Sequence, residues 1–267
     1  MQCIGEQLLY TTTRIQTKTL NGVGVGTGFF FEYGERIFLV TNKHVIKDAI
    51  SGFFTVFKTK EIDGEKTAEL GSLIKIDFTP NAFKGHPDNE IDIAVANVSG
   101  MMNTDQPYIK WVNEELIPDE NFMKKFISPI EDVLFIGYPS DIWDTKNGLP
   151  IIRKGTTATP YYVDFKGKNN FLIDASVFNG SSGSPVFLYY SGSYSDKYGR
   201  MYAGEMLKFL GVIASSYERN QEGEIVNKNI PTNYIPVAIT SQMIDLGVVF
   251  NSKVVLETIK YYVNTLK

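Results

Sequence analysis

Asn179–Pro185 reads NGSSGSP and holds three serines in a frame of glycines. Ser182 has Gly180 two residues before it and Gly183 directly after it. Because glycine adopts backbone conformations that other residues avoid, this turn could expose the Ser182 hydroxyl. It could also aim the backbone N–H groups of Gly180 and Ser182 at one point, as stabilisation of an oxyanion requires. Most Gly/Ser-rich stretches are only turns, so the partners of a nucleophile must come from elsewhere in the chain.

The chain has only two histidines, His44 and His86, and a histidine-dependent mechanism must use one of them. His44 ends the apolar stretch LVTNKHV, whereas His86 lies in the polar turn GHPDNE. Asp92 lies in IDIAV, and a carboxylate in an apolar strand is costly without a partner. A histidine N–H is one such partner, because the carboxylate then fixes the imidazole tautomer. Asp88 and Glu90 lie in the polar turn, where we expect them to be solvated.

These stretches together resemble the signature stretches of chymotrypsin-like serine peptidases, above all the bacterial branch that includes the HtrA-type proteases. The residues that carry the resemblance are LVTNKHVI (Leu39–Ile46), DIAV (Asp92–Val95) and GSSGSP (Gly180–Pro185). Two further stretches resemble the nucleophile loop and the strand that follows it: FLIDASVFNGSSGSPVF (Phe171–Phe187) and LGVIAS (Leu210–Ser215). The order His, Asp, Ser is that of this group of enzymes, and the likeness covers residues 26–239, most of the chain.

The resemblance implies a catalytic triad of His44, Asp92 and Ser182. Ser182 would be the nucleophile, His44 the general base and then the general acid, and Asp92 the orienting acid. The oxyanion hole would be formed by the backbone N–H groups of Gly180 and Ser182. Ser184 does not occupy the nucleophile position, and we expect it to serve the turn.

Two departures from trypsin affect activation and specificity. Ser181 stands where trypsin-type zymogens carry an Asp that pairs with a newly cut N-terminus, so no activation by N-terminal cleavage is expected. Ser176 stands where trypsin carries the acid that selects Lys and Arg. Without a carboxylate there, a buried cationic side chain would be unpaired, which predicts a preference for small or apolar residues. Ser216 is predicted to line the wall of this specificity pocket.

The predicted fold class is all-β, with two antiparallel β-barrels of the six-stranded chymotrypsin-like kind and a C-terminal α-helix. Short segments rich in Val, Ile, Phe and Tyr alternate with turns along most of the chain. Residues 1–120 would form the barrel that carries His44 and Asp92, and residues 121–267 the barrel that carries Ser182. Apolar residues at helical spacing after Val254 predict the terminal helix, packed on the barrels rather than on a partner.

Composition excludes several classes of function. The net charge is −4 and no Lys/Arg block stands out, so nucleic acid is not an expected partner. The single cysteine and two histidines make a poor metal site, and peptide hydrolysis by a triad needs no cofactor. NGVGVGTG (Asn21–Gly28) lacks the GK[ST] ending of a phosphate loop and leads into a Phe-rich segment, so we interpret it as the opening strand of the first barrel.

The N-terminus lacks the basic start and apolar run of a secretory signal, and no apolar stretch approaches the length of a membrane span. We therefore expect a soluble, cytoplasmic protein of bacterial type. About 28 residues follow Ile239, too few for the PDZ domain that HtrA-type proteases usually carry. A lone protease domain is therefore expected, with regulation by loops, by a partner or by self-association into a homo-oligomer.

The function predicted from these features is a serine endopeptidase that hydrolyses protein or peptide substrates through an acyl-enzyme. The alternatives are a catalytically silent protease fold that serves as a scaffold or binding module, and a protease that processes itself. A scaffold has no physical need for all three triad residues, which favours the active enzyme.

Overall fold

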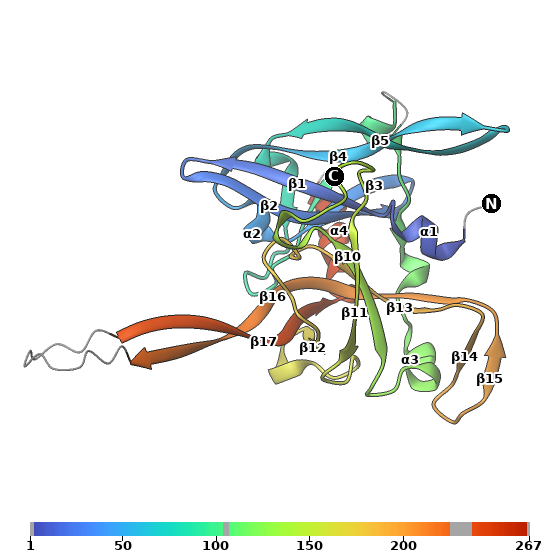
Figure 1. Cartoon of the computed structure of the whole chain (residues 1–267). Helices are drawn as coiled ribbons and strands as arrows, with labels where there is room; N and C mark the ends of the chain where they lie inside the picture. Colours follow the sequence, from blue (N-terminus) through green and yellow to red (C-terminus); the bar gives the residue numbers. More distant parts are fainter. Residues whose placement is uncertain (1–2, 104–106, 225–236, 266–267) are drawn as a thin grey trace, which may run out of the picture.

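The computed structural model describes residues 3–103, 107–224 and 237–265. Two β structures lie one above the other in Figure 1, and the chain crosses once between them. A short helix, α1 (Ile4–Leu8), precedes the first of them, and a longer helix, α4 (Ser252–Thr265), follows the second. Within the described residues, no helix is both long enough and apolar enough to cross a membrane.

The first structure is a nine-stranded sheet whose main path runs β5-β4-β1-β2-β3-β7-β6, with β8 paired to β4 and β9 to β2. Its strands are β1 (Thr12–Thr19), β2 (Gly22–Tyr33), β3 (Arg36–Thr41), β4 (Ala49–Ile62), β5 (Glu65–Phe78), β6 (Phe83–Gly85), β7 (Ala94–Asn97), β8 (Pro107–Tyr108) and β9 (Val112–Asn113). The sequence predicts a hairpin of Val23–Tyr33 and Arg36–Thr41, because Gly34–Glu35 separates two apolar runs. The hairpin is present as β2 and β3, and Gly34 and Glu35 form its turn, both with positive φ. Two residues with positive φ match the twist of a tight hairpin.

This sheet corrects the expectation of two six-stranded barrels, because it is open among the described residues: its edge strands β5 and β6 do not pair. The 3-10 turn Pro80–Ala82 separates them, and Pro80 has no N–H to donate to a ladder. β6 has only three residues, so it offers little edge for closure. Across the seam, the rings of Phe78 and Phe83 are in edge contact, with their centroids 5.1 Å apart.

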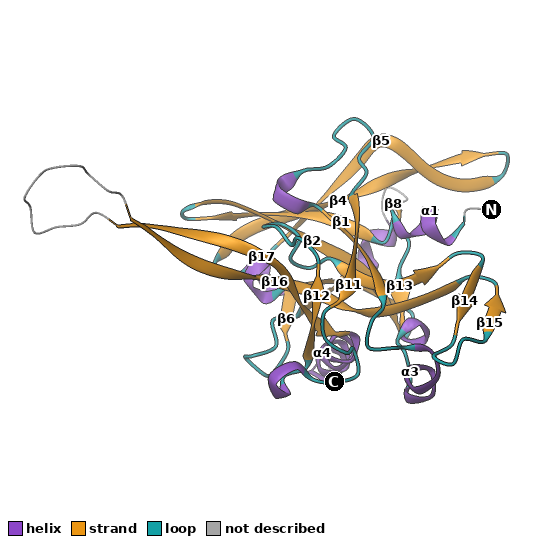
Figure 2. Ribbon diagram, turned by 60° about the horizontal axis from the view of Figure 1, so that its bottom comes forward, coloured by secondary structure: helices purple, strands orange, loops and turns teal. Residues whose placement is uncertain are grey.

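The second structure is a closed barrel of six strands in the order β10-β11-β12-β17-β16-β13. The strands are β10 (Asp132–Gly137), β11 (Ile151–Thr157), β12 (Asn170–Asp174), β13 (Pro185–Tyr190), β16 (Met206–Glu224) and β17 (Val237–Asn251). A small hairpin of β14 (Ser193–Ser195) and β15 (Met201–Ala203) follows β13. The polar stretch Gly192–Gly199 (GSYSDKYG), which the sequence predicts as a surface loop, holds β14 and the turn after it. β16 and β17 run past the barrel together as a two-stranded arm, which projects from the body in both views (Figures 1 and 2).

The terminal helix packs as predicted. Val254, Val255 and Ile259 of α4 are buried in one core with residues of both β structures, including Phe38 and Val212. α4 therefore covers the junction of the two halves. The predicted boundary at residue 121 lies inside the connecting helix α3 (Glu120–Phe126), and the division into two domains stays a prediction. The sequence also predicts a strand over Tyr234–Ala238, and most of that stretch lies outside the described residues.

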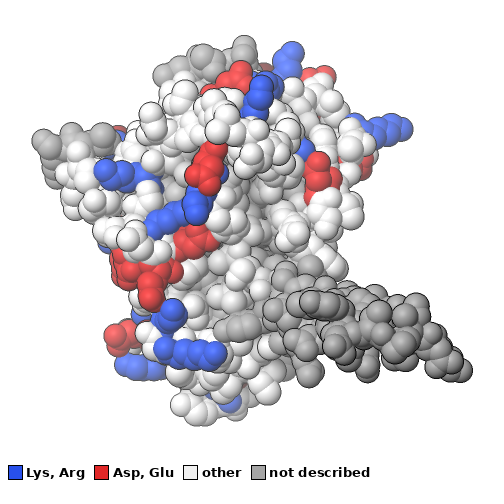
Figure 3. Space-filling view, turned by 90° about the vertical axis from the view of Figure 1, so that its left-hand side faces the viewer, with Lys and Arg blue, Asp and Glu red and all other residues white. Residues whose placement is uncertain are grey.

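Charge is distributed over the surface rather than concentrated. On the face shown in Figure 3, basic and acidic side chains are interspersed. Between the two halves of the chain, Lys168 Nζ and Glu90 Oε2 form an ion pair of 3.0 Å. That face therefore carries no strong field of one sign, in contrast to the concentrated basic surface that phosphate backbones need.

Candidate active site

His44 and Asp92 are brought together by the pairing of β3 with β7. The register Thr41↔Ala94 places the segment after β3 beside the segment before β7. His44 lies in the short helix α2 (Lys43–Ile46) directly after β3. Two bonds to the Asp92 carbonyl tie the segments: Asn42 Nδ2 donates at 2.7 Å and the Lys43 N–H at 3.4 Å. The strand pairing thus sets the imidazole against the carboxylate.

The Asp92 carboxylate uses both of its oxygens on His44. Oδ2 lies 2.5 Å from His44 Nδ1, and Oδ1 accepts the backbone N–H of His44 at 3.0 Å. An ionised carboxylate only accepts, so Nδ1 carries the proton and Nε2 of a neutral ring is left as the acceptor. Nε2 has no hydrogen-bond partner within the described chain, and the ring is half exposed. His44 is therefore oriented to take a proton at Nε2.

A partly buried cation adds to the electrostatics of this segment. Burial holds the pKa of Lys43 below its usual value, while Asp92 and Asp88 act in the opposite direction. Its ammonium group donates to the Asp88 carbonyl at 2.8 Å. The charges of Asp92 and Asp88 thus favour the protonated form of Lys43, against the effect of burial.

Ser182 lies on the loop between β12 and β13, and glycines shape this loop as predicted. Gly180 and Gly183 have φ of 85° and 90°, a region that favours glycine. A Cβ on Gly183 would lie 1.8 Å from the carbonyl oxygen of Thr27. Gly183 is therefore required both by its backbone conformation and by the close approach of β2.

The three predicted triad residues line one cavity of about 410 Å³. The link from serine to histidine is not formed in this state, because Ser182 Oγ donates to the Ala214 carbonyl at 2.9 Å. Rotation about the Cα–Cβ bond of Ser182 would release this bond and turn the hydroxyl toward His44. Catalytic hydrogen bonds commonly tighten only when substrate is bound.

The two predicted oxyanion donors are both unengaged. The N–H groups of Gly180 and Ser182 have no hydrogen-bond partner among the described residues. The Asn179 carbonyl accepts the Ser140 N–H at 2.5 Å. In a trans peptide the N–H points opposite to the carbonyl, so the Gly180 N–H is directed away from Ser140. Unsatisfied N–H groups beside a nucleophile are the feature that an oxyanion hole needs.

The two predicted specificity residues differ in their position relative to the cavity. Ser216 lines the cavity together with the three predicted triad residues, whereas Ser176 is half-buried and is not among the residues that line it. The role of both serines in specificity stays a prediction. No sequence motif assigned a site role to the other lining residues, which come from the nucleophile loop, β16 and β17. These residues are Val177, Phe178, Asn179, Ala214, Ser215, Val248 and Phe250. The β17 residues could not be found from motifs, because the pairing of β17 with β16 brings them there.

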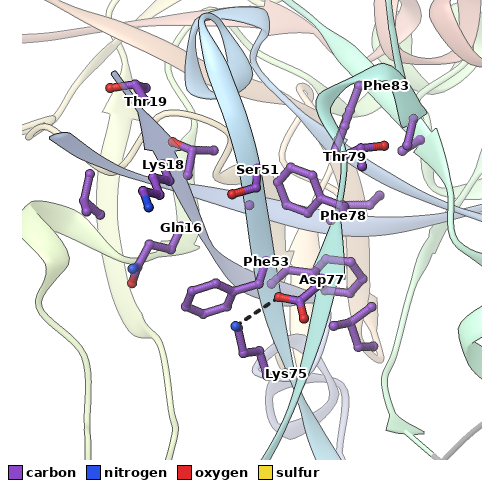
Figure 4. A pocket seen from close by; sticks show the side chains of 18 of the residues that line it. Gln16, Lys18, Thr19, Ser51, Phe53, Lys75, Asp77, Phe78, Thr79 and Phe83 are labelled. Atoms are coloured by element: carbon purple, nitrogen blue, oxygen red, sulfur yellow. Dashed lines mark ion pairs between the residues drawn. The ribbon is translucent and has the colours of Figure 1, made fainter. Parts of the chain in front are cut away.

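A larger cavity lies away from this site, at the open seam of the first sheet (Figure 4). It measures about 1040 Å³ and is mainly apolar, with Phe54, Phe78 and Phe83 in its lining. Lys75 and Asp77 form an ion pair of 3.0 Å at its rim. None of the predicted catalytic residues contributes to it. Of the two cavities, the smaller one is the one whose described lining holds His44, Asp92 and Ser182.

The trypsin-like peptidase domain family matches residues 26–193, which is more than half of the chain and includes His44, Asp92 and Ser182. The chain belongs to this family. No curated protein matches the sequence of this chain.

The solved structures that resemble this trypsin-like peptidase chain include HtrA-type and other bacterial serine proteases. A serine endoprotease from Yersinia pestis is 15% identical with a TM-score of 0.49, and the match covers 98% of this chain and 67% of that protein. An HtrA-type protease, AlgW, is 15% identical with a TM-score of 0.48, covering 96% of this chain and 60% of AlgW. An inactivated protease paralogue of the scabies mite is 14% identical with a TM-score of 0.49, covering 97% and 96%.

Proposed function

We propose that this trypsin-like peptidase domain is an active serine endopeptidase with His44, Asp92 and Ser182 as its triad. One observation carries the proposal: an oriented His44–Asp92 pair and a serine on a glycine-framed loop line the same cavity. In addition, two backbone N–H groups beside that serine have no partner within the described chain.

The chemistry follows from these positions. Ser182 Oγ attacks the carbonyl carbon of the scissile bond while its proton passes to His44 Nε2. The resulting oxyanion accepts hydrogen bonds from the N–H groups of Gly180 and Ser182. The C–N bond then breaks as His44 gives its proton to the leaving amine, which leaves an acyl-enzyme on Ser182. Water attacks the ester, His44 takes and returns a proton, and the acid and free Ser182 are released.

Asp92 supports each step without binding substrate. Its carboxylate holds the Nδ1–H tautomer of His44, so that Nε2 faces the reacting atoms. When His44 becomes an imidazolium, the charge on Asp92 stabilises it. Asp92 stays ionised throughout this cycle.

We further propose a preference for substrates with small or apolar side chains at the cleavage site. Among the described residues that line the cavity, Asp92, which is bonded to His44, is the one carboxylate. A Lys or Arg side chain of the substrate would therefore bring an unpaired charge into this lining. Val177, Phe178 and Val248 offer apolar surface, and Ser216 offers a small polar wall.

Hydrolysis of a casein substrate and of peptide libraries tests the activity, with Ser182→Ala and Ser184→Ala compared to the wild-type chain. Ser184 is a matched control because it lies on the same loop and its buried hydroxyl has no partner among the described atoms. We expect Ser182→Ala to lose at least 10³-fold in kcat/KM and Ser184→Ala to stay within about threefold. Equal hydrolysis by wild type and Ser182→Ala would contradict the proposal.

A further inference from the structure

Thr27, on β2 of the first sheet, bonds to the nucleophile loop on both sides of Ser181. Its N–H donates to the carbonyl of Ser182 at 2.9 Å. Its hydroxyl donates to the carbonyl of Gly180 at 2.8 Å. These are the two residues whose N–H groups form the proposed oxyanion hole. A single buried residue of one sheet therefore holds both ends of the catalytic turn that the other barrel carries.

The direction of the Thr27 hydroxyl is fixed by a third bond. The N–H of Tyr138, at the end of β10, donates to Thr27 Oγ1 at 3.0 Å. Since the hydroxyl has one hydrogen, acceptance from Tyr138 leaves that hydrogen for the Gly180 carbonyl. The Thr27 carbonyl in turn accepts the Thr41 hydroxyl at 2.7 Å. Thr27 is fully buried and is held at its N–H, its carbonyl and its hydroxyl.

Two glycines allow this close approach. A Cβ on Gly183 would lie 1.8 Å from the Thr27 carbonyl oxygen, and a Cβ on Gly137 would lie 2.7 Å from Thr27 Oγ1. Neither distance is possible between real atoms, so a side chain at Gly183 would push β2 away from the loop, and one at Gly137 would push β2 away from β10. The carbonyl and the hydroxyl of Thr27 therefore contact the other half of the chain without spare room.

The bond from Thr27 to Gly180 fixes the peptide plane between the two oxyanion donors. The Gly180–Ser181 peptide is held at its carbonyl by Thr27 and at its N–H by the Phe178 carbonyl, at 3.0 Å. The Ser181 side chain contributes no anchor, because its buried hydroxyl has no partner among the described atoms. The hold on this plane thus depends on Thr27 and on the turn formed with Phe178.

We propose that Thr27 is a positioning residue that keeps the oxyanion hole formed in the absence of substrate and without a charged anchor on the loop. This inference rests on the proposed peptidase function. Thr27 touches neither substrate nor reacting atoms and acts through the Gly180 and Ser182 carbonyls. An anchor of this kind needs no proteolytic activation, because it is made from residues that fold together with the sheet.

Thr27→Val tests the role, since valine keeps the shape of the side chain and removes the hydroxyl. The Gly180 carbonyl and the Tyr138 N–H then lose their partner, and the peptide plane between the donors is released. We expect kcat to fall about 10- to 100-fold with KM within about twofold, because the donors act in the transition state. Thr27→Ser, which restores the hydroxyl, should recover kcat to within about threefold of wild type.

Thr13→Val is the matched control. Thr13 is equally buried, and its hydroxyl donates to the Thr55 carbonyl at 2.6 Å and accepts the Thr55 N–H at 3.1 Å. It has the same kind of bonds in the same sheet, between β1 and β4. Thr13→Val should therefore lower the unfolding temperature as Thr27→Val does and leave kcat unchanged. A fall in kcat that is equal in the two variants would overturn the positioning role.

Hydrogen exchange separates this inference from the proposed activity. Three proteins are compared: Ser182→Ala alone, Ser182→Ala with Thr27→Val, and Ser182→Ala with Thr13→Val. The amides of residues 177–185 should exchange at least tenfold faster in the variant with Thr27→Val than in the other two. Unchanged exchange in Thr27→Val would overturn the role of Thr27, whether or not the wild-type chain hydrolyses peptides. A wild-type chain without hydrolysis would contradict the proposed function alone, and exchange would still decide what Thr27 does.

Discussion

At the scale of single residues, the site depends most on the two oxygens of Asp92. Oδ1 accepts the backbone N–H of His44 and Oδ2 faces its ring. One carboxylate therefore sets both the position of α2 and the tautomer of the imidazole. A residue that could accept only one of these bonds would preserve the fold of the segment and lose the chemistry.

Asp92→Asn makes this separation testable. The amide oxygen can still accept the His44 N–H, but the NH₂ group can only donate to Nδ1, which forces the proton onto Nε2. The ring is then unable to accept the Ser182 proton, and we expect kcat/KM to fall about 10³- to 10⁴-fold. Steady-state kinetics and a thermal melt check this together. A loss below about tenfold, with the fold intact, would remove Asp92 from the mechanism.

The residues of the triad could be predicted from sequence because each has a local signal. His44 and Asp92 follow or interrupt apolar strands, and Ser182 has glycines around it. The orientation of the Ser182 hydroxyl could not be predicted, because its partner Ala214 lies on another strand. The contacts of Thr27 likewise could not be predicted from the sequence. Nothing in NGVGVGTG marks a threonine whose partners come from the other half of the chain.

At the scale of elements, apolar strands were predictable and polar ones were not. β2 and β3 carry runs of Phe, Leu and Val and were expected. β1 reads TTRIQTKT and was not predicted, since several of its buried residues, such as Thr13 and Thr17, are polar. Their hydroxyls are satisfied by bonds to β4 and α2, which hydropathy does not reveal.

Barrel closure also cannot be predicted from the local sequence pattern. Whether two edge strands pair depends on their length and on the turn between them, and here Pro80 and a three-residue β6 keep the first sheet open. The same limit applies to the arm. The extension of β16 and β17 past the barrel follows from their mutual pairing, in which polar residues of β16 such as Glu218 and Glu222 pair with Met243 and Ile239 of β17.

At the scale of the whole molecule, buried tyrosines link stability to alkaline pH. Burial raises the pKa of Tyr161 from 10.0 to about 12, and its hydroxyl bonds to Ser252 of α4 at 3.0 Å. Burial also raises the pKa of Tyr138 and of Tyr190, the second with the help of Glu131. All three must stay neutral in the folded chain, while in the unfolded chain they ionise near pH 10.

The sign of this linkage is set by the raised pKa. Stabilisation from Tyr161 is complete below pH 10 and is lost as pH rises toward 12, a change of about 3 kcal/mol in the free energy of unfolding. Urea denaturation at half-unit steps from pH 9 to 12 measures it. Tyr161→Phe should be less stable at pH 9 and show a shallower decline. Identical slopes in the two proteins would show that Tyr161 does not carry the linkage.

We propose above all that the Ser182 hydroxyl is a nucleophile activated by His44. Labelling with a fluorescent fluorophosphonate, followed by mass spectrometry of the labelled peptide, measures this without a known substrate. We expect one label per chain on Ser182. This label should be lost in Ser182→Ala, and the rate of labelling should fall at least 10²-fold in His44→Ala. No label on the folded wild-type chain, or label on another residue, would contradict it.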